Sequence, residues 1–232
     1  TEMASRHATP HLIVARAGKR QTDGFLTFEE LIESQPLEQA RNRLADIEVN
    51  LADVIVFQLS GGTTNVPKIM PRFHGEYLGM SRAKAIRSSM SEDMVALYAM
   101  PLIHTAGQVA MFYPSILCGA TCVLMQRMDA KEFFTLVERE RVTHSVSMGP
   151  AAVQMIDYEG VREHDLSSLR LLMNFHGSSV MEKHVGVPCL NTYGIGEGMG
   201  MSTDPSSPKE LRHDTVGWPL NPYDEVRIYE PD

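Results

Sequence analysis

Apolar runs of strand length alternate with segments of helical spacing along most of the chain after residue 50. Predicted strands are "DVIVFQLS", "KIMPR", "MVALYAM", "ATCVLM", "THSVSM", "LRLLMNF", "VPCLNTY" and "DEVRIY". Predicted helices between them include "HGEYLGMSRAKAIRSSM", "TAGQVAMFYPSIL", "DAKEFFTLVERERV" and "GPAAVQMIDY". Because the strands are apolar throughout and alternate with helices, the pattern predicts an α/β fold. It is layered, with a largely parallel sheet covered by helices on both faces.

Capping residues and prolines locate several boundaries. Asp129 is predicted as the N-cap of "DAKEFFTLVERERV", and Pro150 stands early in its helix, where proline is tolerated. Pro114 falls late in "TAGQVAMFYPSIL" and is expected to kink or end that helix. The polar, proline-bearing segment "STDPSSPKELRHD" is predicted as a surface loop.

The first 50 residues carry a weaker pattern than the rest. "HLIVAR" predicts a short buried strand, and "PLEQARNRLADI" is polar with helical spacing. In "TFEELIES", Thr27 followed by Glu30 forms a capping-box pattern. We therefore interpret residues 1–50 as a lead-in segment and residues 51–232 as the core that carries the binding sites.

Composition narrows the class of protein. The chain has 232 residues and a net charge of −8, which argues against a nucleic-acid binder. Three cysteines, Cys118, Cys122 and Cys189, lie in apolar surroundings and are interpreted as reduced core residues of a cytoplasmic protein. No apolar run approaches the length of a membrane helix, and no signal-peptide pattern opens the chain.

The stretch "FQLSGGTTNVPK" has the composition of a phosphate-binding loop. Gly61 and Gly62 allow the backbone to approach an anion closely, and Lys68 adds a positive charge. Further hydroxyl donors come from Ser60, Thr63 and Thr64. The spacing differs from that of the P-loop. The alternative interpretation of the glycines is an ordinary turn between two strands.

Three segments, in order, resemble the adenylate-forming enzymes, the superfamily of acyl-CoA synthetases and adenylation domains. "LSGGTTNVPK" resembles their phosphate loop, although Asn65 stands where they usually have glycine; asparagine tolerates a left-handed backbone. "NTYGIGEG" is similar to a second motif of theirs. There the resemblance implies that Tyr193 and Gly194 contact adenine and that Glu197, with Thr64, holds Mg²⁺.

The third segment, "MPLIHTAGQ", resembles the part of the family that lines the acid pocket. The resemblance implies a pocket of His104, Thr105, Ala106 and Gly107, to which Gly177 and Gly198 are added. Ala106 and Gly107 are small, which predicts room for a bulky acid.

The adenine site and the catalytic groups are also inferred from the resemblance. "MNFHGSS" places Gly177 and Ser178 beside adenine. The implied catalytic residues are His104, Glu197 and Lys68.

"VGWPLNPYDEVRI", "FQLSGGTT" and "PRFH" are most similar to the aryl-acid AMP ligases of the dihydroxybenzoate and salicylate type. Those enzymes typically have asparagine directly after the pocket histidine to bind an ortho-hydroxyl group, whereas this chain has Thr105. A threonine hydroxyl could replace that hydrogen bond, or the substrate lacks the ortho-hydroxyl.

The resemblance implies ATP-dependent activation of an aromatic carboxylic acid as acyl-AMP, in secondary metabolism. The acyl group then passes to coenzyme A or to the phosphopantetheine arm of a carrier protein. Members of the family are much longer, so we interpret the chain as a fragment that is inactive alone and lacks the small C-terminal domain. The segment after Ser179, "VMEKHVGVPCLN", has little room for the helix that members have there. The alternative is a non-catalytic remnant that still binds a nucleotide or ligand.

Overall fold

The computed structural model describes residues 13–14, 26–59 and 68–230. The chain divides into two compact units, Thr1–Val49 and Asn50–Asp232. In the first, strand β1 (Ile13–Val14) pairs in parallel with β2 (Leu26–Thr27). Helices α2 (Phe28–Glu33) and α3 (Leu37–Ala45) follow. The Thr27 hydroxyl accepts a hydrogen bond from the Glu30 amide at 3.3 Å, which confirms the predicted start of α2.

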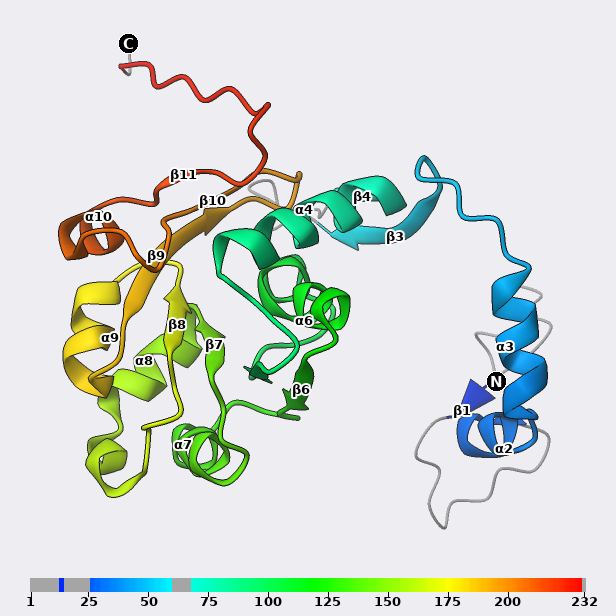
Figure 1. Cartoon of the computed structure of the whole chain (residues 1–232), viewed down its shortest axis with the longest axis horizontal. Coiled ribbons are helices and arrows are strands. Elements are labelled where there is room, and N and C mark those ends of the chain that lie inside the picture. The colour runs from blue at the N-terminus through cyan, green and yellow to red at the C-terminus, as the bar shows by residue number, and fades with distance from the viewer. Residues whose placement is uncertain (1–12, 15–25, 60–67, 231–232) are drawn as a thin grey trace. The chain divides into compact units, whose positions relative to one another are not determined.

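A mixed sheet forms the centre of the second unit (Figure 1). Its described strands are β5 (Val95–Tyr98), β6 (Thr121–Leu124), β7 (His144–Ser147), β8 (Leu171–Asn174), β9 (Cys189–Gly194), β10 (Gly200–Ser202) and β11 (Trp218–Pro219). They stand in the order β11-β10-β9-β8-β7-β5-β6. The five strands from β9 to β6 are parallel, and β10 and β11 are antiparallel to their neighbours. The prediction of a largely parallel sheet is confirmed.

Helices cover both faces of this sheet, as the apolar strands predict. They are α4 (His74–Arg87), α5 (Thr105–Gly107), a π-helical turn (Gln108–Phe112), α6 (Tyr113–Cys118), α7 (Ala130–Arg139), α8 (Gly149–Asp157), a 3₁₀ turn (Glu159–Glu163), α9 (Ser178–Val185) and α10 (Lys209–Asp214). Successive residues of β8 point to opposite faces. Leu172 packs with α7, α8 and α9, whereas Leu171 and Met173 pack toward the π-helical turn.

Strands β3 (Val54–Leu59) and β4 (Ile69–Phe73) form a separate antiparallel pair, with Leu59 opposite Ile69. Residues 60–67, the glycine-rich loop, connect these two strands and lie outside the described residues. The predictions for Ser60, Gly61, Gly62, Thr63, Thr64 and Asn65 therefore stay predictions.

Predicted helix starts at Asp129 and Pro150 are confirmed. The Asp129 carboxylate accepts a hydrogen bond from the Glu132 amide at 2.9 Å, and Pro150 lies at the start of α8. Pro114 was predicted to kink or end its helix. The helix does not end there, but its regular α-helical geometry is interrupted by the π-helical turn directly before Tyr113. Pro114 thus becomes an early residue of α6, where its missing amide leaves no hydrogen bond unmade.

Three local predictions are wrong. "DEVRIY" is not a strand: no described strand pairs with it, and Ile228 is 95% exposed. The predicted loop "STDPSSPKELRHD" contains α10, whose Arg212 is buried. The segment after Gly177 does hold a helix, the eight-residue α9. In each case contacts with distant residues, or their absence, decided the outcome over the local pattern.

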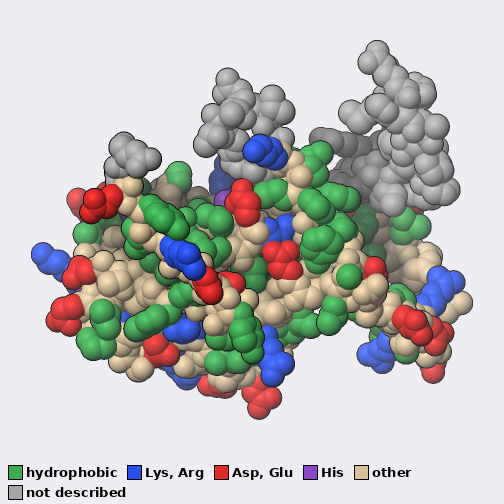
Figure 2. Space-filling model, turned by 90° about the horizontal axis from the view of Figure 1, so that it is seen from above, with side chains coloured by type: hydrophobic (Ala, Val, Ile, Leu, Met, Phe, Trp, Pro, Cys, Tyr) green, Lys and Arg blue, Asp and Glu red, His purple; other side chains and the backbone are tan. Residues whose placement is uncertain are grey.

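The surface of the described residues has no gathering of one charge on the face seen in Figure 2, where Lys and Arg side chains stand among Asp and Glu. The three cysteines are free; Cys189 is buried and the other two are half-buried. Among the described residues, no helix is long and apolar enough to cross a membrane.

Candidate functional site

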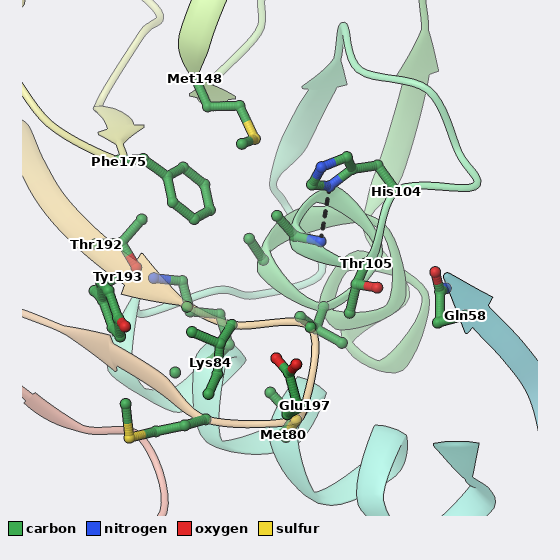
Figure 3. A pocket seen from close by; sticks show the side chains of 18 of the residues that line it. Gln58, Met80, Lys84, His104, Thr105, Met148, Phe175, Thr192, Tyr193 and Glu197 are labelled. Atoms are coloured by element: carbon green, nitrogen blue, oxygen red, sulfur yellow. Dashed lines mark hydrogen bonds between the residues drawn. The ribbon is translucent and has the colours of Figure 1, made fainter. Parts of the chain in front are cut away.

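A cavity of about 620 Å³ lies within the second unit (Figure 3). It is mainly apolar, with a few polar groups at its wall. Its described lining comes from β3, α4, the segment from Pro101 through the π-helical turn, the ends of β7 and β8, and β9 with the turn after it. The lining residues are Phe57, Gln58, Leu59, Met80, Lys84, Pro101, Ile103, His104, Thr105, Ala106, Val109, Ala110, Met148, Phe175, Thr192, Tyr193, Gly194, Ile195, Gly196, Glu197, Met199, Gly200 and Leu220. Segments far apart in sequence thus converge at the carboxyl ends of the parallel strands, where ligands bind in α/β sheets.

The turn between β9 and β10 carries Glu197 and follows Tyr193. Tyr193 is the last but one residue of β9, pairs with Met201 of β10, and is 43% exposed. The Ile195 amide donates to the Met199 carbonyl at 3.0 Å and closes the turn. The Glu197 carboxylate is exposed at the cavity, as Figure 3 shows.

Arg72 of β4 fixes this turn in place. Its guanidinium donates to the Gly196 carbonyl and pairs with the Glu76 carboxylate. The Arg72 side chain is 2% exposed and lies 5.6 Å from the ring of Tyr77. Gly198, at φ +118°, packs so closely that a Cβ there would lie 2.4 Å from the Glu76 carboxylate. The turn that holds Glu197 is therefore built against β4 and α4.

His104 and Thr105 lie across the cavity from Tyr193 in Figure 3. His104 is the N-cap of α5, and its Nδ1 accepts a hydrogen bond from the Ala106 amide at 3.2 Å. In the neutral ring Nε2 then carries the proton and is a donor. His104 therefore caps the helix through Nδ1, and its Nε2–H can donate a hydrogen bond to a molecule in the cavity.

A hydrogen-bonded network joins β3 to this helix. Gln58 donates to the Tyr77 hydroxyl at 3.1 Å and to the Gln108 side chain at 2.9 Å. Gln108 in turn donates to the Leu102 carbonyl at 2.5 Å. The network holds the segment before His104 against the strand that leads into the glycine-rich loop.

Several expected residues lie elsewhere. Gly107 is not part of the described cavity wall, because the Tyr98 side chain fills its side: a Cβ on Gly107 would lie 1.9 Å from the Tyr98 hydroxyl. Gly107 makes room for Tyr98 and does not widen the cavity. Gly198 lies at a smaller hollow beside α4, and Lys68 is exposed just before β4.

Gly177 and Ser178 begin α9 and are not among the described lining residues of the cavity. Gly177 has φ +76°, which favours glycine. Ser178 is fully buried, and its amide donates to the Asn191 side chain at 3.2 Å. This contact joins the start of α9 to β9.

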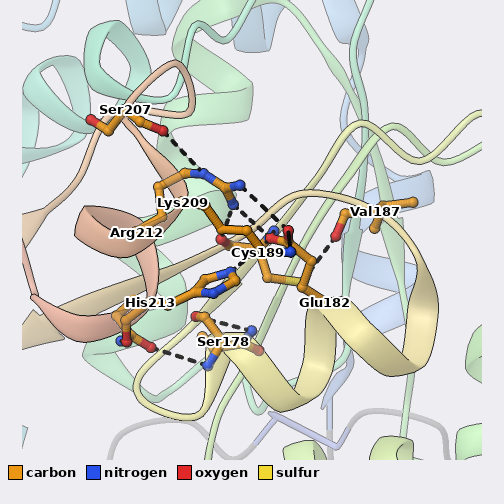
Figure 4. Close-up of polar contacts among 10 residues, drawn as sticks. Ser178, Glu182, Val187, Cys189, Ser207, Lys209, Arg212 and His213 are labelled. Atoms are coloured by element: carbon orange, nitrogen blue, oxygen red, sulfur yellow. Dashed lines mark hydrogen bonds and ion pairs between the residues drawn. The ribbon is translucent and has the colours of Figure 1, made fainter.

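A partly buried ionic cluster ties α9 and α10 to β9 (Figure 4). Glu182 accepts hydrogen bonds from Arg212 at 2.7 Å and from the Cys189 amide at 2.9 Å. His213 and Lys209 also contact this carboxylate, at 2.9 and 3.2 Å. Partial burial acts to raise the pKa of Glu182, but these donors outweigh it and lower the pKa to about 2.

Sequence reasoning missed Arg72, Gln58 and Lys84. Lys84 lies on the buried face of α4, and burial, with a smaller contribution from Arg87, lowers its pKa to about 7. A signal for Lys84 exists in the sequence, because it falls on the same helical face as Tyr77 and Ser81. No signal in the sequence shows what Arg72 contacts.

In the described part of the chain, no group of three or more His, Cys, Asp or Glu side chains gathers to hold an ion. Glu197 is a single exposed carboxylate at the cavity, and Thr64 lies outside the described residues. A cation there would need oxygen ligands from a bound phosphate, which is how Mg²⁺ is usually held.

Comparison with known proteins gives consistent matches. The chain is 38% identical over 208 residues to pyochelin synthase PchD of Pseudomonas aeruginosa (strain UCBPP-PA14), covering 85% of this chain and 37% of that protein. It is 28% identical over 221 residues to the 2,3-dihydroxybenzoate-AMP ligase of Bacillus subtilis (strain 168), covering 90% of this chain and 39% of that protein. The chain therefore spans well under half the length of these relatives.

Solved structures show the same fold. The apo structure of Mycobacterium smegmatis MbtA superposes with a TM-score of 0.82 at 24% identity, covering 99% of this chain and 42% of that one. The family described as "AMP-binding enzyme" matches residues 4–232, almost the whole chain. With the fold, the ordered motifs and the relatives in agreement, the chain belongs to the AMP-binding enzyme family.

Proposed function

We propose that the full-length protein containing this chain activates an aromatic carboxylic acid with ATP and transfers it to a thiol. The acid's carboxylate oxygen attacks the α-phosphorus of ATP, forming acyl-AMP and releasing pyrophosphate. A thiol then attacks the acyl carbon, forming a thioester and releasing AMP and the thiol proton. The thiol belongs to coenzyme A or to a carrier-protein phosphopantetheine arm. Relatives named as AMP ligases and as a CoA ligase support both halves of this reaction.

One observation carries the proposal. Two segments about 90 residues apart in sequence bring His104 and Thr105 to one side of the cavity and Tyr193 and Glu197 to another. A carboxylate donor site and a nucleotide site must adjoin, because the reaction joins the two substrates. An apolar cavity of about 620 Å³ with few polar groups also suits an aromatic acid.

In this proposal the nucleotide lies along the β9–β10 turn. Tyr193 and Gly194 contact adenine, with the half-buried Gly177 on its other side and Ser178 buried behind it. The loop from Ser60 to Lys68 binds the β- and γ-phosphates. Glu197, with Thr64, fits Mg²⁺, since an exposed carboxylate suits a hard cation shared with phosphate. When bound, Mg²⁺ neutralises phosphate charge.

The acid lies with its carboxylate near His104 and its ring toward Thr105 and Ala106. The Nε2 proton of His104 would donate to an acid oxygen and orient it toward the α-phosphate, because Nδ1 is held by the Ala106 amide. Arg72 contributes indirectly, by holding the Gly196 carbonyl and hence the turn that carries Glu197.

The test is carboxylate-dependent exchange of pyrophosphate into ATP, measured on the full-length protein with a panel of aromatic and aliphatic acids. We expect exchange with substituted benzoates and a loss of about 100-fold or more in Glu197→Ala. Glu92→Ala is the matched control, because Glu92 is also an exposed carboxylate and does not line the cavity.

A second candidate is a non-catalytic nucleotide- or ligand-binding protein. Asn65, in place of the usual loop glycine, favours it. ATP binding without exchange for any acid would support this second function, and Asn65→Gly would then be the first reversion to test.

A further inference from the structure

Lys84 is a buried cation in the wall of the cavity. It lies on α4 among the buried residues of that helix, and only 1% of its surface is exposed. Its side chain nevertheless lines the cavity together with Met80 of the same helix. Figure 3 shows Lys84 on the side of the cavity occupied by Thr192 and Tyr193.

The hydrogen bonding of Lys84 is incomplete within the described part of the chain. Its Nζ donates to the Ser202 hydroxyl at 3.0 Å, and Ser202 in turn donates to the Thr203 carbonyl at 3.0 Å. An ammonium group has three N–H donors, so Ser202 uses one of them. No ion pair among the described residues involves Lys84. A buried cation without a counter-ion is costly, and its lowered pKa reflects that cost.

Apolar side chains make up much of the cavity wall that Lys84 joins. Met80, Met199 and Leu220 line the cavity with it, and Phe175 faces the cavity from the end of β8. His104 lies on another side of the cavity from Lys84 in Figure 3. If the acid's carboxylate is at His104, as the proposed function has it, a substituent remote from that carboxylate can reach the part of the wall that holds Lys84.

We infer that Lys84 determines specificity by binding a hydrogen-bond-accepting or anionic substituent on the end of the acid remote from the reacting carboxylate. The inference rests on the proposed function for the orientation of the acid. It narrows the substrate class to aromatic acids that carry a second polar group, such as a ring hydroxyl or a second carboxylate.

The preference follows from the different free energies of binding acids with and without an acceptor group beside Lys84. An acid with an acceptor at that end completes the donors of Lys84 and forms a charge-assisted hydrogen bond. An unsubstituted acid covers the same cation with carbon and leaves its donors unpaired, which is expensive in an apolar site. A site built to pair with a substrate group discriminates strongly against analogues that lack the group.

A competing explanation makes Lys84 purely structural, as a link between α4 and β10 through Ser202. The two roles differ in what a substitution does to substrate choice. Loss of a structural link would lower activity alike for every acid. Loss of a specificity residue lowers activity for acceptor-bearing acids and spares the others.

The experiment compares Lys84→Met with the parent in the full-length protein. Methionine keeps the length of the side chain and removes the donors. Arg82→Met is the matched control, because Arg82 is an exposed cation on the same helix. The substrates are benzoate and cinnamate, each beside its ring-hydroxylated and ring-carboxylated derivatives. Pyrophosphate exchange gives kcat/KM for each acid, and thermal unfolding shows whether each variant folds; Lys84→Gln replaces Lys84→Met if the latter does not.

We expect the parent to prefer acceptor-bearing acids. In Lys84→Met, kcat/KM for those acids should fall about 10- to 100-fold, the loss expected for one charge-assisted hydrogen bond. For unsubstituted acids it should change less than about 3-fold or rise. An equal fall for all acids, or a parent with no preference for acceptor-bearing acids, would overturn the inference.

A binding measurement separates this inference from the proposed function. The same acids are added to both proteins and the change in unfolding temperature is recorded. Stabilisation of the parent, but not of Lys84→Met, by acceptor-bearing acids supports the inference even where no acid supports exchange. If no acid stabilises the parent protein and none supports pyrophosphate exchange by it, both the proposed function and the inference are wrong.

Discussion

Arg212 and Lys84 are two buried cations with opposite surroundings, Arg212 bonded to β9 and Lys84 to the neighbouring strand β10. Arg212 is 8% exposed and pairs with the Glu182 carboxylate at 2.7 Å, with further bonds to backbone carbonyls. Lys84 is 1% exposed and contacts the neutral hydroxyl of Ser202. Figures 3 and 4 show that Lys84 borders a cavity, whereas Arg212 lies among protein groups.

The comparison distinguishes a buried cation that is paired within the protein from a buried cation whose donors can bind a ligand. A buried charge with its counter-ion and hydrogen bonds in place contributes to a unique packing, and removing one partner exposes the full cost of the other. A buried charge without a counter-ion weakens the fold but keeps its donors for a molecule in the cavity. Replacing Arg212 should therefore lower the unfolding free energy. Replacing Lys84 should raise the unfolding free energy and change which acids are accepted.

The largest effect is expected for Arg212→Met. The substitution leaves the Glu182 carboxylate partly buried with fewer donors, so the protein should lose about 3–5 kcal/mol of unfolding free energy. Denaturant unfolding measures it. A loss below about 1 kcal/mol would mean that the cluster is solvated and that the contrast with Lys84 does not hold.

The next effect concerns the pH dependence of Glu182. Its pKa is lowered to about 2 from an ordinary value of 4.5, so its stabilising contribution is complete above pH 4.5 and is lost as the pH falls toward 2. The stability difference between the parent and Glu182→Gln should therefore be level above pH 5 and shrink by roughly 3 kcal/mol between pH 4.5 and 2. A difference that does not change over that range would contradict the assignment.

Lys84→Met should stabilise the protein by about 2 kcal/mol at pH 6, the opposite sign to Arg212→Met. The pKa of Lys84 is lowered to about 7 from 10.5, so the unfolded chain binds the extra proton between these values and the parent gains stability as pH rises through them. The gain from Lys84→Met should hence be largest below pH 7 and decline toward pH 10.5.

The smallest effect is expected for Ser202→Ala, at about 1 kcal/mol of destabilisation below pH 7. The substitution removes the hydroxyl that accepts a hydrogen bond from the Lys84 ammonium group. Above pH 10.5, where Lys84 is neutral in both states, much of this loss should vanish. Denaturant unfolding of Ser202→Ala at pH 6 and pH 10.5 measures this loss. Equal losses of unfolding free energy at the two pH values would show that the Ser202 hydroxyl stabilises the fold mainly through its hydrogen bond to the Thr203 carbonyl.

Local patterns predicted the parts of the fold in which each residue's environment follows from its neighbours in sequence. The parallel strands and α7 with its Asp129 cap were predicted correctly, because apolar runs and capping residues act within a few positions. "DEVRIY" has the alternation of a strand, but a strand forms by pairing and no described strand pairs with it. α10 was missed because Arg212 is buried through a distant carboxylate, which its own segment does not show.

The candidate site likewise contains residues that sequence motifs predicted and residues whose role depends on remote contacts. His104, Thr105, Tyr193 and Glu197 were predicted from motifs, and all four line one cavity. The predictions for residues 60–67 stay predictions, since these residues lie outside the described part of the chain. Gly107 was expected to widen the pocket, but the side chain of Tyr98, nine residues earlier, fills the space.

By itself the sequence determined the fold class, the family resemblance and which side chains were candidates for chemistry, because periodicity and motif order are properties of neighbouring residues. Helical spacing also places Lys84 on the same face of its helix as Tyr77 and Ser81. The tertiary structure decided that this face meets a cavity and that Ser202, 118 positions later, is the partner of Lys84 instead of a carboxylate. The physical reason is that the cost and use of a buried charge depend on every group around it in space, and most of those groups are remote in sequence.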